Sequence, residues 1–183
     1  MIPPRASALI VPVPQAEWLV GPWREQYDDS ARTGVPAHVT LLYPFLPPEE
    51  ITPADLERLR SLFATVPATR FRLTAARRFS RGVLYLAPEP EEFFQKLTAR
   101  IWRLYPDYPP YGGVFQHVVP HLTVSQVEDH ALLDQIEAVV TKGLPIEAEA
   151  TEAWLMVEAD ENRWQPGHRF ALWSTITPEP TGG

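Results

Sequence analysis

The sequence predicts an α+β protein in which two similar lobes face each other across a central groove. Helical and extended patterns alternate along the chain, and the extended segments come in pairs that suit antiparallel sheets. The same order of strand, helix, strand and strand occurs over residues 38–86 and again over residues 121–176, which indicates an ancient duplication. Hydrophobic residues make up 45% of the chain, enough for a real core.

In the first half, turn residues and apolar spacing separate the elements. Thr52 and Pro53 are typical of an N-cap and a first helical residue, and leucines at helical spacing follow them. The expected elements are a strand at 7–13, a helix at 14–27, a strand at 38–43, a helix from 53, and strands at 71–75 and 83–86 joined by a hairpin turn at 77–82.

In the second half, apolar residues at helical spacing predict a helix over residues 91–104. A segment rich in Pro, Tyr and Gly follows at 105–113 and indicates a loop. The remaining expected elements are an edge strand at 115–119, a strand at 121–127, a helix at 129–140, and strands at 150–157 and 170–176 joined across residues 160–167.

Length, charge and composition narrow the class of protein. The 183 residues suit a single bilobal domain over residues 1–177, with a disordered tail at 178–183. A net charge of −7 argues against binding to long duplex nucleic acid. The absence of cysteine excludes disulfides, thiolate zinc sites and a cysteine nucleophile. The apolar run at 8–13 is too short and too interrupted for a signal peptide or a membrane span, so we expect a cytoplasmic protein without membrane contact.

The tripeptide His-x-Thr, which occurs twice, is the feature that points to chemistry. The copies are His38-Val39-Thr40 and His121-Leu122-Thr123. Each follows a proline closely and lies in an apolar run, which predicts a strand just after a turn. Because side chains alternate faces along a strand, the histidine and the threonine of each copy share one face.

Two imidazoles, each with a hydroxyl beside it, match what metal-free phosphodiester cleavage needs. Histidine titrates near neutral pH, so one ring can accept a proton while the other donates one. The hydroxyls of Thr40 and Thr123 can donate to the non-bridging phosphate oxygens. The near-symmetry leaves the two roles exchangeable; we assign His121 as the base toward water and His38 as the acid toward the leaving oxygen.

Simpler interpretations exist for each residue, and metal binding is one alternative. Taken alone, either histidine is more simply a buried or capped residue, and either threonine a good strand former. His117 and His121 have the spacing of a helical metal site, but Pro120 between them argues against a helix. Without a ligand cluster elsewhere, the sequence predicts no metal and no cofactor.

The paired motifs and their strand context resemble the 2H phosphoesterase superfamily. The phrase from Pro36 to Phe45, PAHVTLLYPF, resembles its bacterial 2′-5′ RNA ligase-like (LigT-like) branch, and the likeness covers residues 8–176. The resemblance implies a bilobal, pseudo-twofold fold with antiparallel sheets lining a cleft and helices outside. It also implies metal-independent action on 2′,3′-cyclic phosphates, with His38 and His121 catalytic and Thr40 and Thr123 binding phosphate.

Several further residues are candidates for substrate binding. Ser125 shares the strand parity of His121 and Thr123 and could add a phosphate donor. The basic group at 77–81 is either a solvated hairpin or a phosphate clamp. Aromatic residues near the motifs could stack a base, although most aromatics suit the core better. The candidates are Tyr43, Phe45, Arg77, Arg81, Tyr111, Phe115 and Ser125.

The predicted function is a cyclic phosphodiesterase that acts on the 2′,3′-cyclic phosphate ends of RNA or of small nucleotides, and that could also join RNA ends through a 2′-5′ linkage. Its partner is therefore a nucleotide or RNA-end substrate, and we expect a monomer. The alternative is a non-catalytic nucleotide- or phosphate-binding module that retains the same cleft. The sequence does not distinguish hydrolysis from ligation or name the physiological substrate.

Overall fold

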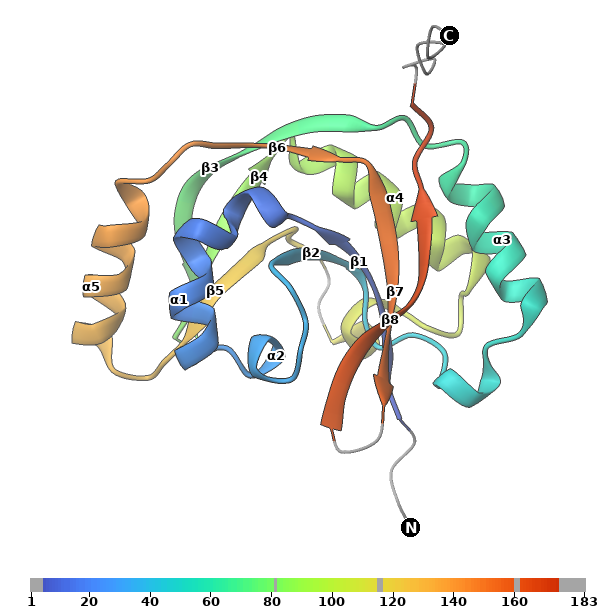
Figure 1. Ribbon diagram of the computed structural model, residues 1–183, viewed down its shortest axis with the longest axis horizontal. Helices are drawn as coiled ribbons and strands as arrows, with labels where there is room; N and C mark the ends of the chain where they lie inside the picture. The colour runs from blue at the N-terminus through green and yellow to red at the C-terminus, as the bar shows by residue number, and fades with distance from the viewer. Residues whose placement is uncertain (1–4, 81, 115–116, 160–161, 175–183) are drawn as a thin grey trace, which may run out of the picture.

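The computed structural model describes residues 5–80, 82–114, 117–159 and 162–174, and it contains two four-stranded antiparallel sheets with helices packed around them (Figure 1). The elements up to residue 89 are β1 (Ser7–Pro12), η1 (Pro14–Ala16), α1 (Glu17–Tyr27), α2 (Asp29–Arg32), β2 (His38–Leu42), η2 (Pro48–Glu50), α3 (Pro53–Phe63), β3 (Thr69–Phe79) and β4 (Val83–Glu89). Those that follow are α4 (Glu91–Leu104), η3 (Pro110–Gly113), β5 (Leu122–Gln126), α5 (His130–Thr141), β6 (Ile146–Ala150), β7 (Glu152–Ala159) and β8 (Arg163–Ala171). The α+β class is confirmed, and the tail expected at 178–183 lies outside the described residues.

Each sheet combines strands from both halves of the chain. The strand orders are β2-β1-β7-β8 and β5-β4-β3-β6. The two motif strands, β2 and β5, therefore occupy equivalent edge positions, and they contact each other where the sheets meet. The helices also cross over, because α1 packs against β5 and α4 packs against β2. Because each sheet contains strands from both halves, the two motifs, which are distant in sequence, lie together where the two sheets meet.

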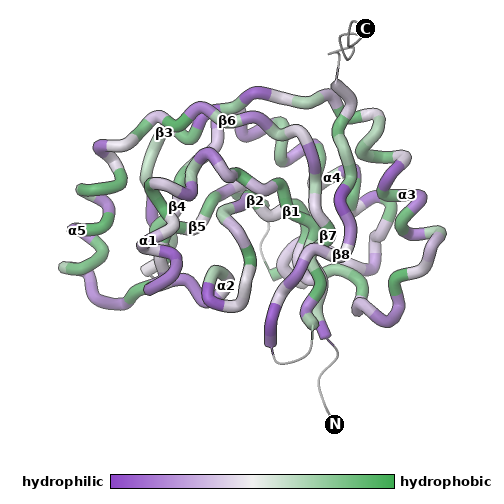
Figure 2. Tube along the Cα trace, in the orientation of Figure 1, coloured by the Kyte–Doolittle hydropathy of each residue, from purple (hydrophilic) through white to green (hydrophobic). Residues whose placement is uncertain are grey.

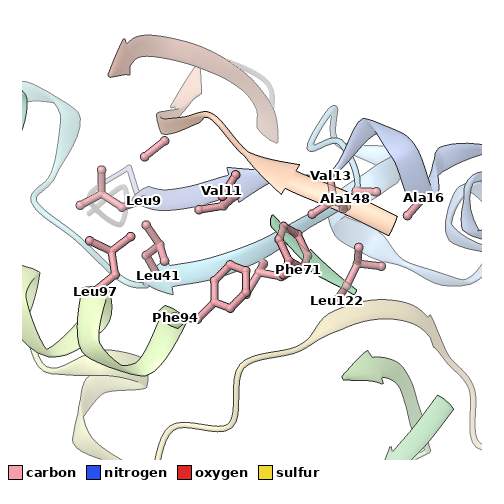
Figure 3. Packing of buried hydrophobic residues seen from close by; sticks show 14 of the residues in the cluster. Leu9, Val11, Val13, Ala16, Leu41, Phe71, Phe94, Leu97, Leu122 and Ala148 are labelled. Carbon is pink, nitrogen blue, oxygen red and sulfur yellow. The ribbon is translucent and has the colours of Figure 1, made fainter. Parts of the chain in front are cut away.

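The expected alternation along the motif strands is confirmed. Val39 and Leu41 of β2 are buried in the main core, as are Leu122 and Val124 of β5. Figure 3 shows Leu41 beside side chains of α4 in this core. The opposite face of each strand is left for the histidine and the threonine, which are only partly buried. Burial of the apolar face thus fixes the direction of the polar one.

The outer helices are amphipathic and cover the sheets. Figure 2 shows hydrophobic and hydrophilic residues alternating along α5, whose buried side chains are Leu133, Ile136 and Val140. The expected start of α3 is confirmed, since Thr52 and Asp55 form a reciprocal capping box. Within the described ranges, no helix is both long and apolar enough to span a membrane.

Two strands extend into segments that the sequence indicated as connections. Strand β3 continues to Phe79, because Arg77 and Arg78 pair with residues of β4 instead of forming the hairpin turn expected at 77–82. Strand β8 begins at Arg163 and not near Phe170, because residues 163–166 of the expected connection at 160–167 pair with β7. In both segments, hydrogen bonds to a neighbouring strand override weak strand propensity. The edge strand expected at 115–119 is absent at 117–119, and residues 115–116 lie outside the described residues.

Candidate active site

A cavity of about 400 Å³ lies where the two motif strands meet. Its lining includes His38 and Thr40 from β2 and Thr123 from β5, together with Tyr111 from η3. Both His-x-Thr motifs therefore contribute at least one side chain to this cavity. His121 lies beside this lining, with its ring stacked on that of Tyr111 at a centroid distance of 6.3 Å.

The two histidine rings are held in the same way. The Nδ1 of His38 lies 2.7 Å from the carbonyl oxygen of Pro36, and the Nδ1 of His121 lies 2.8 Å from that of Val119. A carbonyl oxygen only accepts, so each Nδ1 carries a proton and donates it. In the neutral form of each ring, Nε2 is then the unprotonated nitrogen, which can accept a proton from a substrate or a water molecule.

Burial lowers the pKa of His38 to about 4. The positive charge of Arg24 is the second cause of this lowered pKa, and His121 acts weakly in the same direction. The hydrogen bond to Pro36 and the negative charge of Asp28 oppose the shift without cancelling it. His38 is therefore neutral at pH 7 and has the protonation state of a general base.

His121 lies in an aromatic environment. Phe79 and Tyr85 pack edge-on against its ring, at centroid distances of 5.0 and 5.6 Å. Burial lowers the pKa of His121, and the hydrogen bond to Val119 acts in the opposite direction. The two histidines thus share a backbone anchor but differ in their surroundings, since within the described ranges charged groups shift the pKa of His38 and not that of His121.

Tyr111 links the two motifs. Its hydroxyl is hydrogen-bonded to Thr40, yet burial dominates and raises the pKa of Tyr111 to about 12, so the hydroxyl stays protonated. Its backbone has a φ of 53°, an uncommon conformation for a residue other than glycine, and its N–H donates to the carbonyl of Tyr43 over 2.6 Å. A strained residue tied into a cavity wall is typical of a functional position.

The structure reveals a buried ion pair that the sequence analysis missed. Arg24, in α1, donates to Asp28 over 3.0 Å, and the side chains of the two are 3% and 1% exposed. Asp28 and Ser30 line the same cavity as His38. The arginine-to-aspartate spacing of four was visible in the sequence, but such pairs are usually solvated on a helix surface.

One wall of the cavity is apolar and aromatic. It includes Ile10, Val35 and Met156, which form a small cluster separate from the main core, with Trp164 packed against it. Tyr43 contacts Trp164 edge-on at a centroid distance of 6.2 Å, and its side chain is 40% exposed. The sequence analysis missed Trp164 because it lies in the segment expected to connect β7 and β8.

Ser125 does not face the cavity, contrary to the expectation from strand parity. The pairing of β4 with β5 shifts here, since Tyr85 pairs with Thr123 while its neighbour Leu84 pairs with Ser125. This irregularity places an extra residue on β5 and reverses the faces beyond it. Gln126 lines the cavity instead, and Ser125 is fully buried with no hydrogen-bond partner for its hydroxyl in the described part of the chain.

Other sequence candidates also fall outside the cavity. Phe45 is 2% exposed and packs edge-on against Tyr105 at 4.9 Å, so it belongs to the core. Arg77 forms an ion pair with Glu91 over 3.3 Å and lines a separate cavity, which removes it as a phosphate clamp at this site. Arg81 and Phe115 lie outside the described residues. Across the described ranges, no group of three or more His, Asp or Glu residues is placed to hold a metal ion.

Comparisons with known proteins match this chain to a family of RNA ligases and to phosphoesterases. A model of the 2′-5′ RNA ligase superfamily matches residues 11–162. A candidate phosphoesterase of Geobacillus kaustophilus is 28% identical over 121 residues, which cover 64% of this chain and 66% of that protein. A second, from Bacillus licheniformis, is 23% identical over 90% of this chain and 96% of its own length.

Solved structures show the same fold. The crystal structure of Escherichia coli LigT complexed with 3′-AMP matches with a TM-score of 0.57 and 19% identity, covering 92% of this chain and 98% of LigT. The structure of TT0787 from Thermus thermophilus matches with a TM-score of 0.61 and 20% identity, covering 93% of this chain and 100% of TT0787. At such identities the likeness concerns the fold.

Proposed function

Since the chain belongs to the 2′-5′ RNA ligase superfamily, within the 2H phosphoesterases, we propose that it hydrolyses 2′,3′-cyclic phosphates on nucleotides or RNA ends. The observation that carries this proposal is the single cavity that holds His38, Thr40 and Thr123, with His121 stacked beside it on Tyr111. The matching Nδ1 contacts give both rings the same reactive nitrogen.

The proposed reaction is an in-line displacement at phosphorus. One Nε2 accepts a proton from water while the water oxygen bonds to phosphorus, and the bond from phosphorus to one ribose oxygen breaks. The other histidine, protonated at Nε2, donates its proton to that leaving oxygen. The hydroxyls of Thr40, Thr123 and Tyr111 donate to the non-bridging oxygens as their charge grows. If a ribose 5′-hydroxyl took the place of water and the 3′ oxygen were the leaving group, the same steps would form a 2′-5′ linkage.

The surroundings of the rings favour His38 as the base and His121 as the acid in hydrolysis. The pKa of His38 is lowered to about 4 by burial and by Arg24, so this ring is neutral over most of the pH range. The pKa of His121 is also lowered by burial, but within the part of the chain that the structure describes no cation adds to that effect. This assignment reverses the one made from the sequence, where near-symmetry left the two roles exchangeable.

The apolar wall supports a substrate that carries a base. Trp164 and Tyr43 present aromatic surface on the cavity that contains Thr40, and base–aromatic stacking typically contributes about 1–3 kcal/mol per base. The LigT structure holds 3′-AMP, a nucleotide with its phosphate on a ribose oxygen, as the product of opening a cyclic phosphate would have. We therefore propose nucleoside cyclic phosphates as the substrate class.

The test is turnover of the four nucleoside 2′,3′-cyclic phosphates by purified protein in the presence of a chelator. We expect hydrolysis by the native protein and a loss of about 10²–10⁴-fold in both His38→Ala and His121→Ala. His168→Ala, which changes an exposed histidine of β8, is the matched control and should retain full activity. Binding of these nucleotides without turnover in any variant would instead favour the non-catalytic binding module.

A further inference from the structure

The reactive orientation of His38 depends on a carbonyl in the segment just before β2. His38 donates its Nδ1 proton to Pro36, so the position of that carbonyl decides where Nε2 points. Pro36 has no N–H with which to anchor its own peptide. The segment of residues 35–37 must therefore be fixed through the residues on either side of the proline.

Side chains of α1 hold both of those flanking residues. Arg24 donates to the carbonyl of Val35 over 3.3 Å. The N–H of Ala37 donates to the Glu17 carboxylate over 2.6 Å, a short hydrogen bond to a charged acceptor. The carbonyl of Ala37 also accepts from the N–H of Val13 over 2.7 Å. The peptide units around Pro36 are thus held from both ends by α1 and the residue before η1.

The arginine is itself oriented by a buried network. Arg24 donates to Ser30 over 3.1 Å in addition to its pairing with Asp28. Asp28 in turn accepts from the backbone N–H and the hydroxyl of Ser30, over 3.0 and 2.9 Å. A buried ion pair often stabilises a fold no more than apolar residues of similar size would. Its position between α1 and the segment before His38 indicates a role beyond stability.

We propose that Glu17 and Arg24 are positioning residues for His38, which act by fixing the peptide units on both sides of the Pro36 carbonyl. The ring is thereby kept in the tautomer with the proton on Nδ1, and Nε2 is kept directed toward the phosphate. This inference rests on the proposed function for its catalytic consequence, but the tautomer itself is a property of the protein without substrate. The charged and titratable groups that act on this ring are Arg24, Asp28 and His121.

The test compares two substitutions at Glu17 with a matched one on the same helix. Glu17→Ala removes the acceptor for Ala37, whereas Glu17→Gln retains an oxygen acceptor and removes only the charge. The Glu17 side chain is 41% exposed, so both variants should fold. Glu25→Ala, at an exposed position of α1, is the control. Arg24→Lys is a further variant, which keeps the positive charge but loses the planar guanidinium whose N–H groups bind Val35 and Ser30.

Three readouts separate positioning from stability. Side-chain ¹⁵N NMR reports the tautomer of each neutral histidine, steady-state kinetics report kcat and KM, and thermal unfolding reports stability. In Glu17→Ala we expect His38 to lose its strict Nδ1–H tautomer while His121 keeps its own. We expect kcat to fall about 10- to 100-fold with little change in KM, because a misplaced catalytic group costs rate more than binding. Glu17→Gln should recover most of kcat, and Arg24→Lys should resemble Glu17→Ala.

The proposal is overturned if His38 keeps the Nδ1–H tautomer in both Glu17→Ala and Arg24→Lys. It is equally overturned if Glu25→Ala lowers kcat as much as Glu17→Ala does, since the effect would then be a general weakening of α1. Should the native protein hydrolyse no cyclic nucleotide, the proposed function fails, and the NMR measurement still decides whether α1 sets the tautomer.

Discussion

The pH dependence of kcat/KM is the sharpest prediction from the paired histidines. The perturbation is a change of pH from about 3.5 to 9 at constant ionic strength. In the proposed mechanism His38, whose pKa is lowered to about 4, is the neutral base, so we expect activity to be lost as pH falls through that value. His121 must be protonated, and burial lowers its pKa below the ordinary value of 6.5, so activity is also lost as pH rises toward neutrality.

The size of the effect follows from these pKa values. At pH 7, neutral His38 outnumbers its protonated form roughly a thousandfold. At the same pH, less than about a quarter of His121 is protonated, because its pKa lies below 6.5. We therefore expect kcat/KM to have its optimum between about pH 4 and 6.5, and to reach at pH 7 less than about a quarter of its maximum. The apparent pKa values of the two limbs of this profile describe the pair of histidines together and not either ring alone.

The assay is the initial rate with a nucleoside 2′,3′-cyclic phosphate far below KM, with circular dichroism at each pH to confirm that the protein remains folded. A bound phosphate anion favours the charged form of both rings and raises both pKa values, so the profile of kcat should lie at higher pH than that of kcat/KM. A kcat/KM profile with one titrating limb, or with an optimum above pH 7.5, would refute the reasoning.

The remaining predictions concern single side chains of the cavity. Thr40→Val and Thr123→Val keep the branched shape but remove the donor; we expect kcat/KM to fall about 100-fold with unchanged thermal unfolding. Trp164→Ala should raise KM for cyclic nucleotides about tenfold, while Trp173→Ala, at an exposed tryptophan, should change neither constant. Ser125→Ala removes a buried hydroxyl that has no hydrogen-bond partner among the described residues, so it should raise the free energy of unfolding by about 1 kcal/mol and leave turnover unchanged. A large loss of turnover would instead indicate that Ser125 contacts the substrate phosphate.

The motif strands were predictable because their signal is local. Alternation along five residues places Val39 and Leu41 in the core, and that burial leaves His38 and Thr40 on the other face. The resemblance carried by the two motifs also pointed to the correct fold. Both inferences depend on residues close together in sequence, where spacing alone decides geometry.

The features that sequence reasoning missed depend on pairing between distant segments. The irregular pairing of β5 with β4 at Thr123 and Ser125 depends on the register between these strands, which no periodicity within β5 reveals. Trp164 reaches the cavity because β8 pairs with β7 through a segment rich in polar and turn residues. Arg24 is buried where Asp28, Ser30 and Val35 accept hydrogen bonds from its guanidinium. In each case the partner, not the residue itself, determines the outcome.

A duplicated fold poses a chemical problem that these distant contacts solve. Two equivalent motifs supply two equivalent histidines, but acid–base catalysis needs one ring neutral and the other charged at the same pH. The backbone contacts at Pro36 and Val119 are alike and cannot distinguish the rings. The difference comes from the neighbours, because the charges of Arg24 and Asp28 act on His38 while aromatic rings surround His121. In the proposed mechanism, the asymmetry that assigns the catalytic roles therefore lies in residues outside both motifs, which is where changes of function within this fold should be sought.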